Sequence, residues 1–222
     1  MDPGTWDLLL RSVGPLLMGA VAGTIPLTLA SFVIGLAIAL VVALARLSTI
    51  RPLNVLAGAY ISVIRGTPLL VQLFIIFYAL PSLGVLIDPF PSAVVAFSLN
   101  VGGYAAEAIR GSILAIPRGQ WEAASTIGLG YALTLRRVIL PQALRVAVPP
   151  LSNTFISLVK DTSLASSIMV TELLRRAQEI AAPSYQFLAL YCLAAVIYWL
   201  ICTVLSFGQQ RLERRLSHYV TV

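Results

Sequence analysis

The chain has 222 residues, of which 59% are hydrophobic and only 11% are charged, and its mean hydropathy is +0.91. A soluble domain carries about 25% charged residues because its surface faces water. This composition excludes a soluble globular fold and predicts a surface covered by lipid. Lys and Arg (fifteen) outnumber Asp and Glu (nine), but these cations fall between long apolar runs. That pattern is typical of membrane loops and argues against a nucleic-acid partner.

Five apolar runs are long enough to cross a bilayer, which needs about 20 residues. The first charges are the acidic Asp2 and Asp7, and the apolar run that follows Arg11 is far longer than the core of a signal peptide, so no cleaved signal is expected. The sequence therefore predicts an all-α, multi-pass membrane protein with a single domain over residues 1–222. In chain order, the expected spans cover about residues 24–44, 56–80, 92–114, 146–170 and 186–207.

The connections between these spans differ in charge. If alternate connections share a side, one side holds nine cations and only two acids, Glu122 and Glu213. The opposite side holds five acids and three cations. The positive-inside rule then places the N-terminus outside and the C-terminus in the cytoplasm. The nine cations are Arg46, Arg51, Arg118, Arg136, Arg137, Arg145, Arg211, Arg214 and Arg215.

The outer connection at residues 171–181 has helical spacing. Leu173, Ala177 and Ile180 fall on one face, and the charged residues fall on the other. This pattern predicts an amphipathic helix that lies in the outer membrane interface.

The longest polar connection, at about residues 117–145, contains a spaced motif. Glu122, Ala123 and Ala124 are followed after three residues by Gly128, and after nine more by Val138, with Leu140 and Pro141 completing the pattern. Glu and Ala favour a short helix, and the small alanines keep it slim enough to enter a cleft on another protein. Glycine ends helices by adopting a positive φ. Pro141 is expected where the chain turns back toward the membrane.

This motif resembles the EAA loop of ABC importer permeases, with Val138 in place of the usual isoleucine. The resemblance implies that the short helix is a coupling helix that docks into an ATP-binding subunit and transmits its closing and opening. The coupling residues would be Glu122, Ala123, Ala124, Gly128, Leu140 and Pro141. An ordinary amphipathic loop is the alternative interpretation.

Three further segments are similar to the polar amino acid permeases of this family, which transport histidine, glutamine, arginine or cystine. They lie at residues 65–72, 100–111 and 157–164. The resemblance therefore covers roughly residues 20–210, and the chain looks most similar to the cystine type. This resemblance implies the type I ABC importer fold in a bacterial inner membrane. It also implies a second, identical or homologous permease subunit and a periplasmic substrate-binding protein.

Charged residues inside a membrane span indicate function, because burying a charge in lipid is unfavourable. Glu107 and Arg110, three residues apart on one helix, could simply neutralise each other. Alternatively, Glu107 or Asp161 binds the ammonium group of an amino acid. Backbone N–H groups where Pro68 interrupts its helix, or nearby hydroxyls, would then bind the carboxylate. The predicted substrate path consists of Thr67, Gln72, Asn100, Glu107, Asp161, Thr162 and Ser163.

The chain has no phosphate-binding loop, because its single lysine, Lys160, follows Val159. No cofactor is expected on it, and ATP with Mg²⁺ would bind the partner ATPase subunit. The single histidine, His218, gives no metal cluster and no catalytic pair, so the chain is not predicted to be an enzyme. The competing function is an ion-coupled secondary amino acid transporter, in which Glu107 and Asp161 relay ions without an ATPase.

Overall fold

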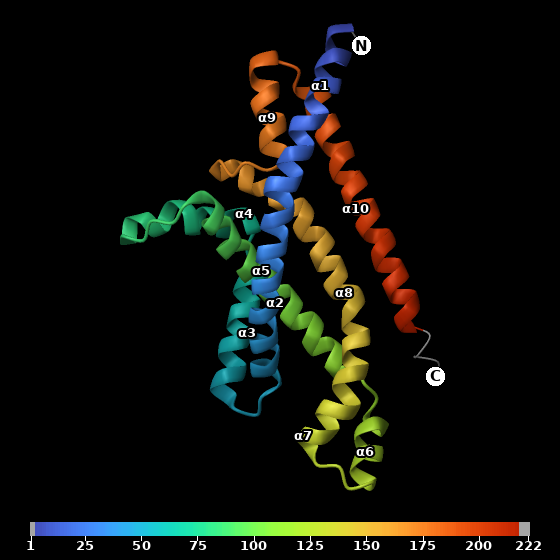
Figure 1. The fold of residues 1–222 in the computed structure, drawn as a ribbon. Helices are drawn as coiled ribbons and strands as arrows, with labels where there is room; N and C mark the ends of the chain where they lie inside the picture. Colours follow the sequence, from blue (N-terminus) through green and yellow to red (C-terminus); the bar gives the residue numbers. More distant parts are fainter. Residues whose placement is uncertain (1–2, 218–222) are drawn as a thin grey trace.

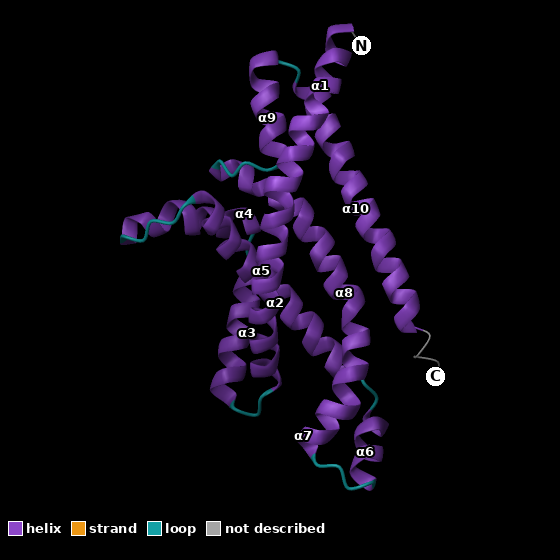
Figure 2. Ribbon diagram, in the orientation of Figure 1, coloured by secondary structure: helices purple, strands orange, loops and turns teal. Residues whose placement is uncertain are grey.

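A computed structural model describes residues 3–217, and Asp2 and His218 therefore lie outside the described residues. This part of the chain consists of helices joined by short loops and contains no strand (Figure 2). Figure 1 shows the N-terminal helix and α9 (Leu173–Ser184) at one end of the molecule. The helices α6 (Arg118–Thr126) and α7 (Tyr131–Thr134) lie at the other end. The expected all-α fold is confirmed.

The N-terminal third begins with one very long helix. α1 (Pro3–Gly19) continues through a π-helical turn (Ala20–Thr24) into α2 (Ile25–Leu47) without a break. The apolar stretch Gly4–Leu47 has 44 residues, or about 66 Å at 1.5 Å per residue. The expected span at 24–44 is only its second half. The helix includes Asp7 and Arg11, which form an exposed ion pair one turn apart, with Arg11 Nε 2.9 Å from Asp7 Oδ2.

The second expected span is not straight. α3 (Arg51–Gly66) ends before Pro68, and α4 (Leu69–Phe74) leaves the break at an angle of 105°. Proline disfavours helical geometry in the residue before it, and Thr67 is extended with φ −121° and ψ 145°. The interruption at Pro68 that the sequence predicts within the span at 56–80 is therefore confirmed, and the structure adds the sharp bend. α4 continues through a π-helical turn (Ile75–Ala79) into a short 3-10 helix (Leu80–Leu83).

The rest of the chain supplies three long helices. α5 (Pro89–Leu114) and α10 (Phe187–Ser217) are long and apolar enough to cross a membrane, as is the N-terminal helix, and the bent pair adds a further candidate span. α8 (Leu140–Asp161) occupies the place of the fourth expected span and has 22 residues. It is followed by a 3-10 helix (Thr162–Ile168). Its polar residues place it outside the apolar candidates, and several of them line the pocket described below.

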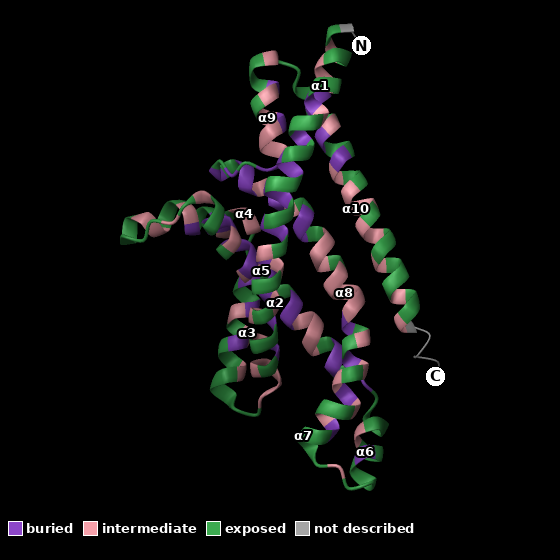
Figure 3. Cartoon of the chain, viewed as in Figure 1, coloured by how far each residue is buried: buried purple, intermediate pink, exposed green. Residues whose placement is uncertain are grey.

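The core forms where α2, α5 and α8 meet. Small residues let α2 and α5 approach closely, as they do in many membrane bundles. A Cβ added to Gly35 would lie 2.6 Å from Val101 Cβ, and one added to Gly102 would lie 2.7 Å from Ile38 Cγ2. Phe97 is fully buried at this crossing. Figure 3 shows exposed residues along the outer faces of α1, α2 and α10. Many of these are large and apolar, which fits surfaces that face lipid or another membrane subunit.

α9 contains the amphipathic face that the sequence predicts, but that face contacts protein. Leu173 and Ala177 are fully buried against Leu16 of α1 and Ala194 of α10. The expectation that this helix presents its apolar face to the membrane interface is wrong, because α1 and α10 already cover it. Figure 1 shows α9 standing beside both helices.

A buried glutamate anchors the start of α9. Glu172 has no exposed surface, and its carboxylate accepts bonds from Leu174 N (2.8 Å) and Arg175 N (2.6 Å). The hydroxyl of Tyr198 on α10 donates to the same carboxylate at 2.6 Å. Leu173 N donates to Thr24 Oγ1 at 3.3 Å, which adds the π-helical turn to this network. A charge that the sequence assigns to an outer loop is therefore an internal helix cap.

Candidate functional site

The predicted coupling helix forms, and it ends as its sequence indicates. α6 covers Arg118–Thr126 and contains Glu122. Gly128 has φ +78°, and its N–H donates to Ser125 O at 3.0 Å. Leu129 N donates to Ala124 O at 3.1 Å. These two bonds make a Schellman motif, in which a left-handed residue closes the helix.

α6 presents one face outward and packs the other against the body of the chain. Glu122 and Ala123 are exposed, whereas Ala124 is only 3% exposed. Trp121 stacks on Tyr131 with ring centroids 5.5 Å apart, which joins α6 to α7. An apolar cluster beneath them connects the loop to the end of α5; its buried members are Ile113, Ile116, Ile139 and Ala143. A partner bound at Glu122 would therefore contact a helix that this packing holds in place.

Pro141 does not mark the turn that the sequence predicts. The chain reverses at Ile127–Gly130, and from Tyr131 onward it is continuously helical into α8. A π-helical turn at Leu135–Ile139 immediately precedes Pro141, so the proline, which has no N–H to donate, lies beside an irregular turn of a continuous helix. The position of Pro141 is corrected for this reason. Leu140 instead packs against the apolar cluster below α6.

The predicted substrate residues converge in part on a pocket of about 500 Å³. Thr67 lies at the break in the second span, Asn100 on α5 and Asp161 at the end of α8, and all three line this pocket. The remaining lining residues are Pro68, Leu69, Val101, Tyr104, Asn153, Thr154, Ser157 and Leu158. The pocket thus joins three segments that are far apart in the chain.

Gln72 lies behind the pocket and braces the helix break. Its Nε2 donates to Ile64 O (2.8 Å) and to Thr67 O (3.1 Å), two carbonyls that the break leaves without helical partners. The same nitrogen lies 2.9 Å from Thr67 Oγ1. Gln72 Oε1 accepts from Asn100 Nδ2 at 3.3 Å. Gln72 therefore shapes the pocket wall from behind.

The hydroxyl of Thr67 is not a free donor. It donates its single proton to Val63 O at 2.8 Å and accepts from Gln72. Thr162, another predicted donor, is fully buried and donates to Val159 O at 2.7 Å. Thr162 and Ser163 both lie outside the pocket lining. The hydroxyls of Thr67 and Thr162 are therefore used within the fold, and Ser163 lies outside the pocket lining.

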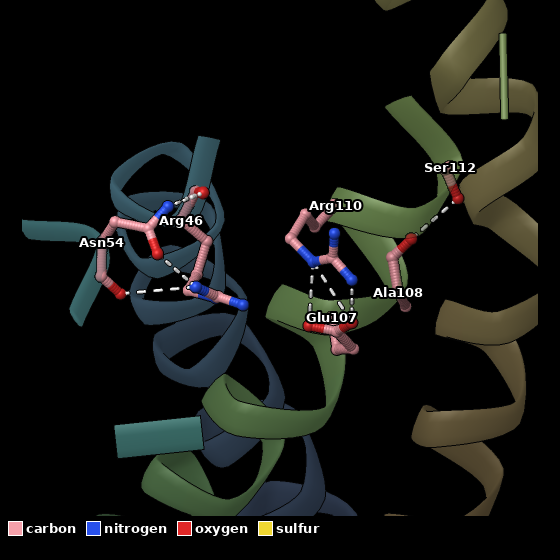
Figure 4. Close-up of polar contacts among 6 residues, drawn as sticks. All are labelled: Arg46, Asn54, Glu107, Ala108, Arg110 and Ser112. Atoms are coloured by element: carbon pink, nitrogen blue, oxygen red, sulfur yellow. Dashed lines mark hydrogen bonds and ion pairs between the residues drawn. The ribbon is translucent and has the colours of Figure 1, made fainter. Parts of the chain in front are cut away.

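Glu107 pairs with Arg110, as the structural alternative predicts. Arg110 Nε lies 3.2 and 3.1 Å from the two carboxylate oxygens of Glu107, and Arg110 Nη2 contacts the same group. Figure 4 shows this fork on α5 facing the hairpin where Arg46 bonds to Asn54. Glu107 does not line the pocket. Asp161 is therefore the carboxylate of the pocket.

Four polar lining residues were not predicted from the sequence: Tyr104, Asn153, Thr154 and Ser157. Helical spacing gives a signal for three of them. Asn153, Ser157 and Asp161 follow at intervals of four on α8, and Tyr104 follows Asn100 by four on α5. Residues four apart share a helix face. Asp161 on α8 and Asn100 on α5, which were predicted, therefore indicated by helical spacing which other residues share their faces.

The comparisons with known proteins agree with this geometry. Residues 35–218 match the family described as "Binding-protein-dependent transport system inner membrane component". The chain is 61% identical to the L-cystine transport system permease protein TcyB of Bacillus subtilis (strain 168), over 97% of this chain and 92% of that protein. It is 43% identical to the glutamine transport system permease protein GlnP of Escherichia coli (strain K12), over 91% and 94% of the two chains.

A solved structure has the same fold. The crystal structure of an amino acid ABC transporter with histidines matches with a TM-score of 0.89 and 36% identity, over 93% of this chain and 96% of the other. The chain therefore belongs to the family of binding-protein-dependent transport system inner membrane components. It is the transmembrane permease subunit of an amino acid ABC importer, as the sequence predicts.

Proposed function

We propose that this permease carries L-cystine into the cytoplasm through the pocket between the α3–α4 break, α5 and α8. The observation that supports it best is a polar pocket of about 500 Å³ containing one carboxylate, Asp161, in a chain 61% identical to an L-cystine permease. Asp161 would bind a substrate ammonium group. The N–H groups at the start of α4, beside Pro68, and the polar side chains of α8 would bind a carboxylate.

We also propose that α6 docks into a separate ATP-binding subunit through Glu122 and Ala123, with Gly128 setting the end of the helix. Ala124 and Leu140 pack beneath this surface, and Pro141 follows in the helix that leads from the loop into α8. ATP and Mg²⁺ would then bind the partner, this chain would bind no cofactor, and ATP hydrolysis would belong to the partner. The whole chain acts as one permease domain, with its coupling loop at about 117–145.

The proposed topology places α9 outside and α6 in the cytoplasm. Figure 1 supports it, because the loop between α2 and α3 lies at the same end as α6, and α10 runs from the α9 end toward that end. A periplasmic binding protein would deliver substrate to the outer end. A second permease subunit would complete the path, since one chain leaves many large apolar side chains exposed. No relative supports the ion-coupled transporter.

Purification of the tagged chain from membranes in mild detergent, with mass spectrometry of the accompanying proteins, tests this function. We expect an ATP-binding subunit that is lost when Glu122 is replaced by Trp, and cystine uptake that requires ATP after reconstitution. A chain that purifies alone and moves cystine without ATP would contradict the proposal.

A further inference from the structure

Two asparagines, Asn100 on α5 and Asn153 on α8, line the pocket, and each is hydrogen-bonded to a glutamine. An amide side chain has one end that donates and one that accepts. The end that bonds to the glutamine therefore decides which end remains for a ligand.

The amide of Asn100 has its orientation set by groups that can only accept. Ile64 O and Thr67 O are carbonyls, and the hydroxyl of Thr67 has already given its proton to Val63 O. Only the nitrogen of Gln72 can face these three acceptors, so its oxygen faces Asn100. Asn100 must meet that oxygen with Nδ2. Its oxygen, Oδ1, is left for the pocket.

The hydrogen bonds of Asn153 fix its amide in the opposite orientation. Gln209 Nε2 on α10 lies 2.8 Å from the carboxylate of Glu213, which can only accept. The same nitrogen lies 2.9 Å from Asn153 Oδ1. Both N–H groups of Gln209 are thus used by acceptors, and Asn153 must present its oxygen to them. The amide nitrogen of Asn153 is left for the pocket.

We propose that Gln72 and Gln209 are positioning residues that polarise the pocket, so that Asn100 accepts from a substrate ammonium and Asn153 donates to a substrate carboxylate. This inference rests on the proposed role of the pocket as the substrate site. Asn100 and Asp161 form the pole that attracts a positive charge, and Asn153 forms the pole that attracts a negative one. The glutamines act from behind and contact no substrate.

The separation of the poles favours a long substrate. Asn153 and Asp161 are eight residues apart on α8, which corresponds to about 12 Å along the helix. The ammonium and carboxylate of a single α-amino acid group share one carbon atom and lie much closer together. Cystine carries both charges at each of its two ends. The pocket would therefore hold the ammonium of one end at Asp161 and the carboxylate of the other end at Asn153.

Binding of radiolabelled cystine to the purified complex of permease and ATP-binding subunits, without the binding protein, tests this arrangement. Two competitors separate the poles: cystamine has two amines and no carboxylate, and dithiodipropionate has two carboxylates and no amine. Gln209→Met removes the amide behind Asn153. We expect about tenfold weaker binding of cystine and of dithiodipropionate, because a hydrogen bond to a charge is lost. Cystamine should compete as before.

Two further variants make the test directional. Gln209→Glu places an acceptor-only group behind Asn153, so Asn153 should turn its nitrogen to the glutamate and its oxygen to the pocket. Cystamine should then compete more strongly, and dithiodipropionate should compete more weakly. Asn100→Leu should weaken cystamine about tenfold and leave dithiodipropionate unchanged. Gln210→Met, on the neighbouring exposed residue of α10, is the matched control and should change neither.

The outcomes separate this inference from the function on which it rests. Equal effects of Gln209→Met on the two competitors, or no effect on either, would overturn the polarised pocket while cystine binding itself persists. Failure of the unaltered complex to bind cystine at all would overturn the pocket as the substrate site, and this inference with it. A variant complex that melts at the unaltered temperature shows that the changes in binding do not arise from unfolding.

Discussion

Two glutamates, on short helices at opposite ends of the molecule, show how differently one residue type is used (Figure 1). Glu172 at the start of α9 is fully buried, and its carboxylate joins α9 to α10. Glu122 on α6 is exposed and lies on a helix that the chain braces from below. A carboxylate whose hydrogen bonds are made within the chain stabilises the fold, whereas an exposed one on a braced helix is available to a partner.

The largest expected effect is on Glu172. Glu172→Ala removes the cap of α9 and leaves buried N–H groups and the hydroxyl of Tyr198 without an acceptor. We expect a loss of about 2–4 kcal/mol in the free energy of unfolding, measured by thermal unfolding of the complex in detergent. Glu179→Ala is the control on the same helix, since its exposed ion pairs contribute less than about 1 kcal/mol. Equal losses in the two variants would contradict the buried cap.

Glu122→Trp tests the exposed glutamate of this pair. The side chain is exposed, so the unfolding temperature should stay unchanged. Transport should fall at least about tenfold, as expected for a central interface residue, and the ATP hydrolysis that accompanies the permease should be lost with its ATPase subunit. Uptake and ATP hydrolysis in proteoliposomes measure both. Asp7→Trp, exposed at the opposite end, is the control. Normal uptake with Glu122→Trp would remove α6 from the coupling surface.

Gly128 and Gly130 offer a matched pair in the same loop. A Cβ added at either position would meet open space, but only Gly128 has a positive φ. Gly128→Val should strain the end of α6 by about 1–2 kcal/mol and reduce uptake several-fold. Gly130→Val should leave uptake nearly unchanged, because its φ of −67° suits any residue. Similar uptake in the two variants would show that the Schellman ending is dispensable for coupling.

Asp161→Ala tests the pocket without touching the coupling surface. We expect about tenfold lower uptake, because an ion pair or charged hydrogen bond to the substrate is lost, with normal recovery of the assembled complex. Asp88→Ala, an exposed acid at the start of α5, should leave uptake unchanged. Wild-type uptake with Asp161→Ala would remove Asp161 from the site.

The smallest effect is expected for Glu107→Gln. This carboxylate pairs with Arg110, and both side chains are partly exposed, at 29% and 26%, so the pair contributes less than about 1 kcal/mol. Uptake should change by less than about twofold. A loss of uptake as large as that of Asp161→Ala would show that Glu107, like Asp161, belongs to the substrate path.

The helix of the proposed coupling loop and its ending at Gly128 were predicted from sequence because their determinants are local. The Glu122–Gly128 segment contains its own helix formers and its own stop, and the structure reproduces both. The exception is Pro141. Its neighbours continue a helix through a π-helical turn, and whether a proline ends a helix or is accommodated beside an irregular turn depends on the packing around it.

The pocket was predicted only in part, because it joins distant segments. The sequence identified Thr67, Asn100 and Asp161, yet it also included Glu107, Thr162 and Ser163, which lie outside the lining. Hydrophobic runs locate spans, but they do not report which face of each helix turns inward. The direction of each amide and the target of each hydroxyl proton likewise depend on neighbours from other helices.

The sequence alone therefore determined the membrane class, the approximate spans, the coupling motif and the family resemblance, since composition and local spacing specify all of these. Only the tertiary structure decided that the second span bends by 105°, that α9 packs on α1 and α10, and that Glu172 is internal. Each of these depends on contacts between residues far apart in the chain. Such contacts leave no periodic signal in one sequence, because each partner alone is compatible with many environments.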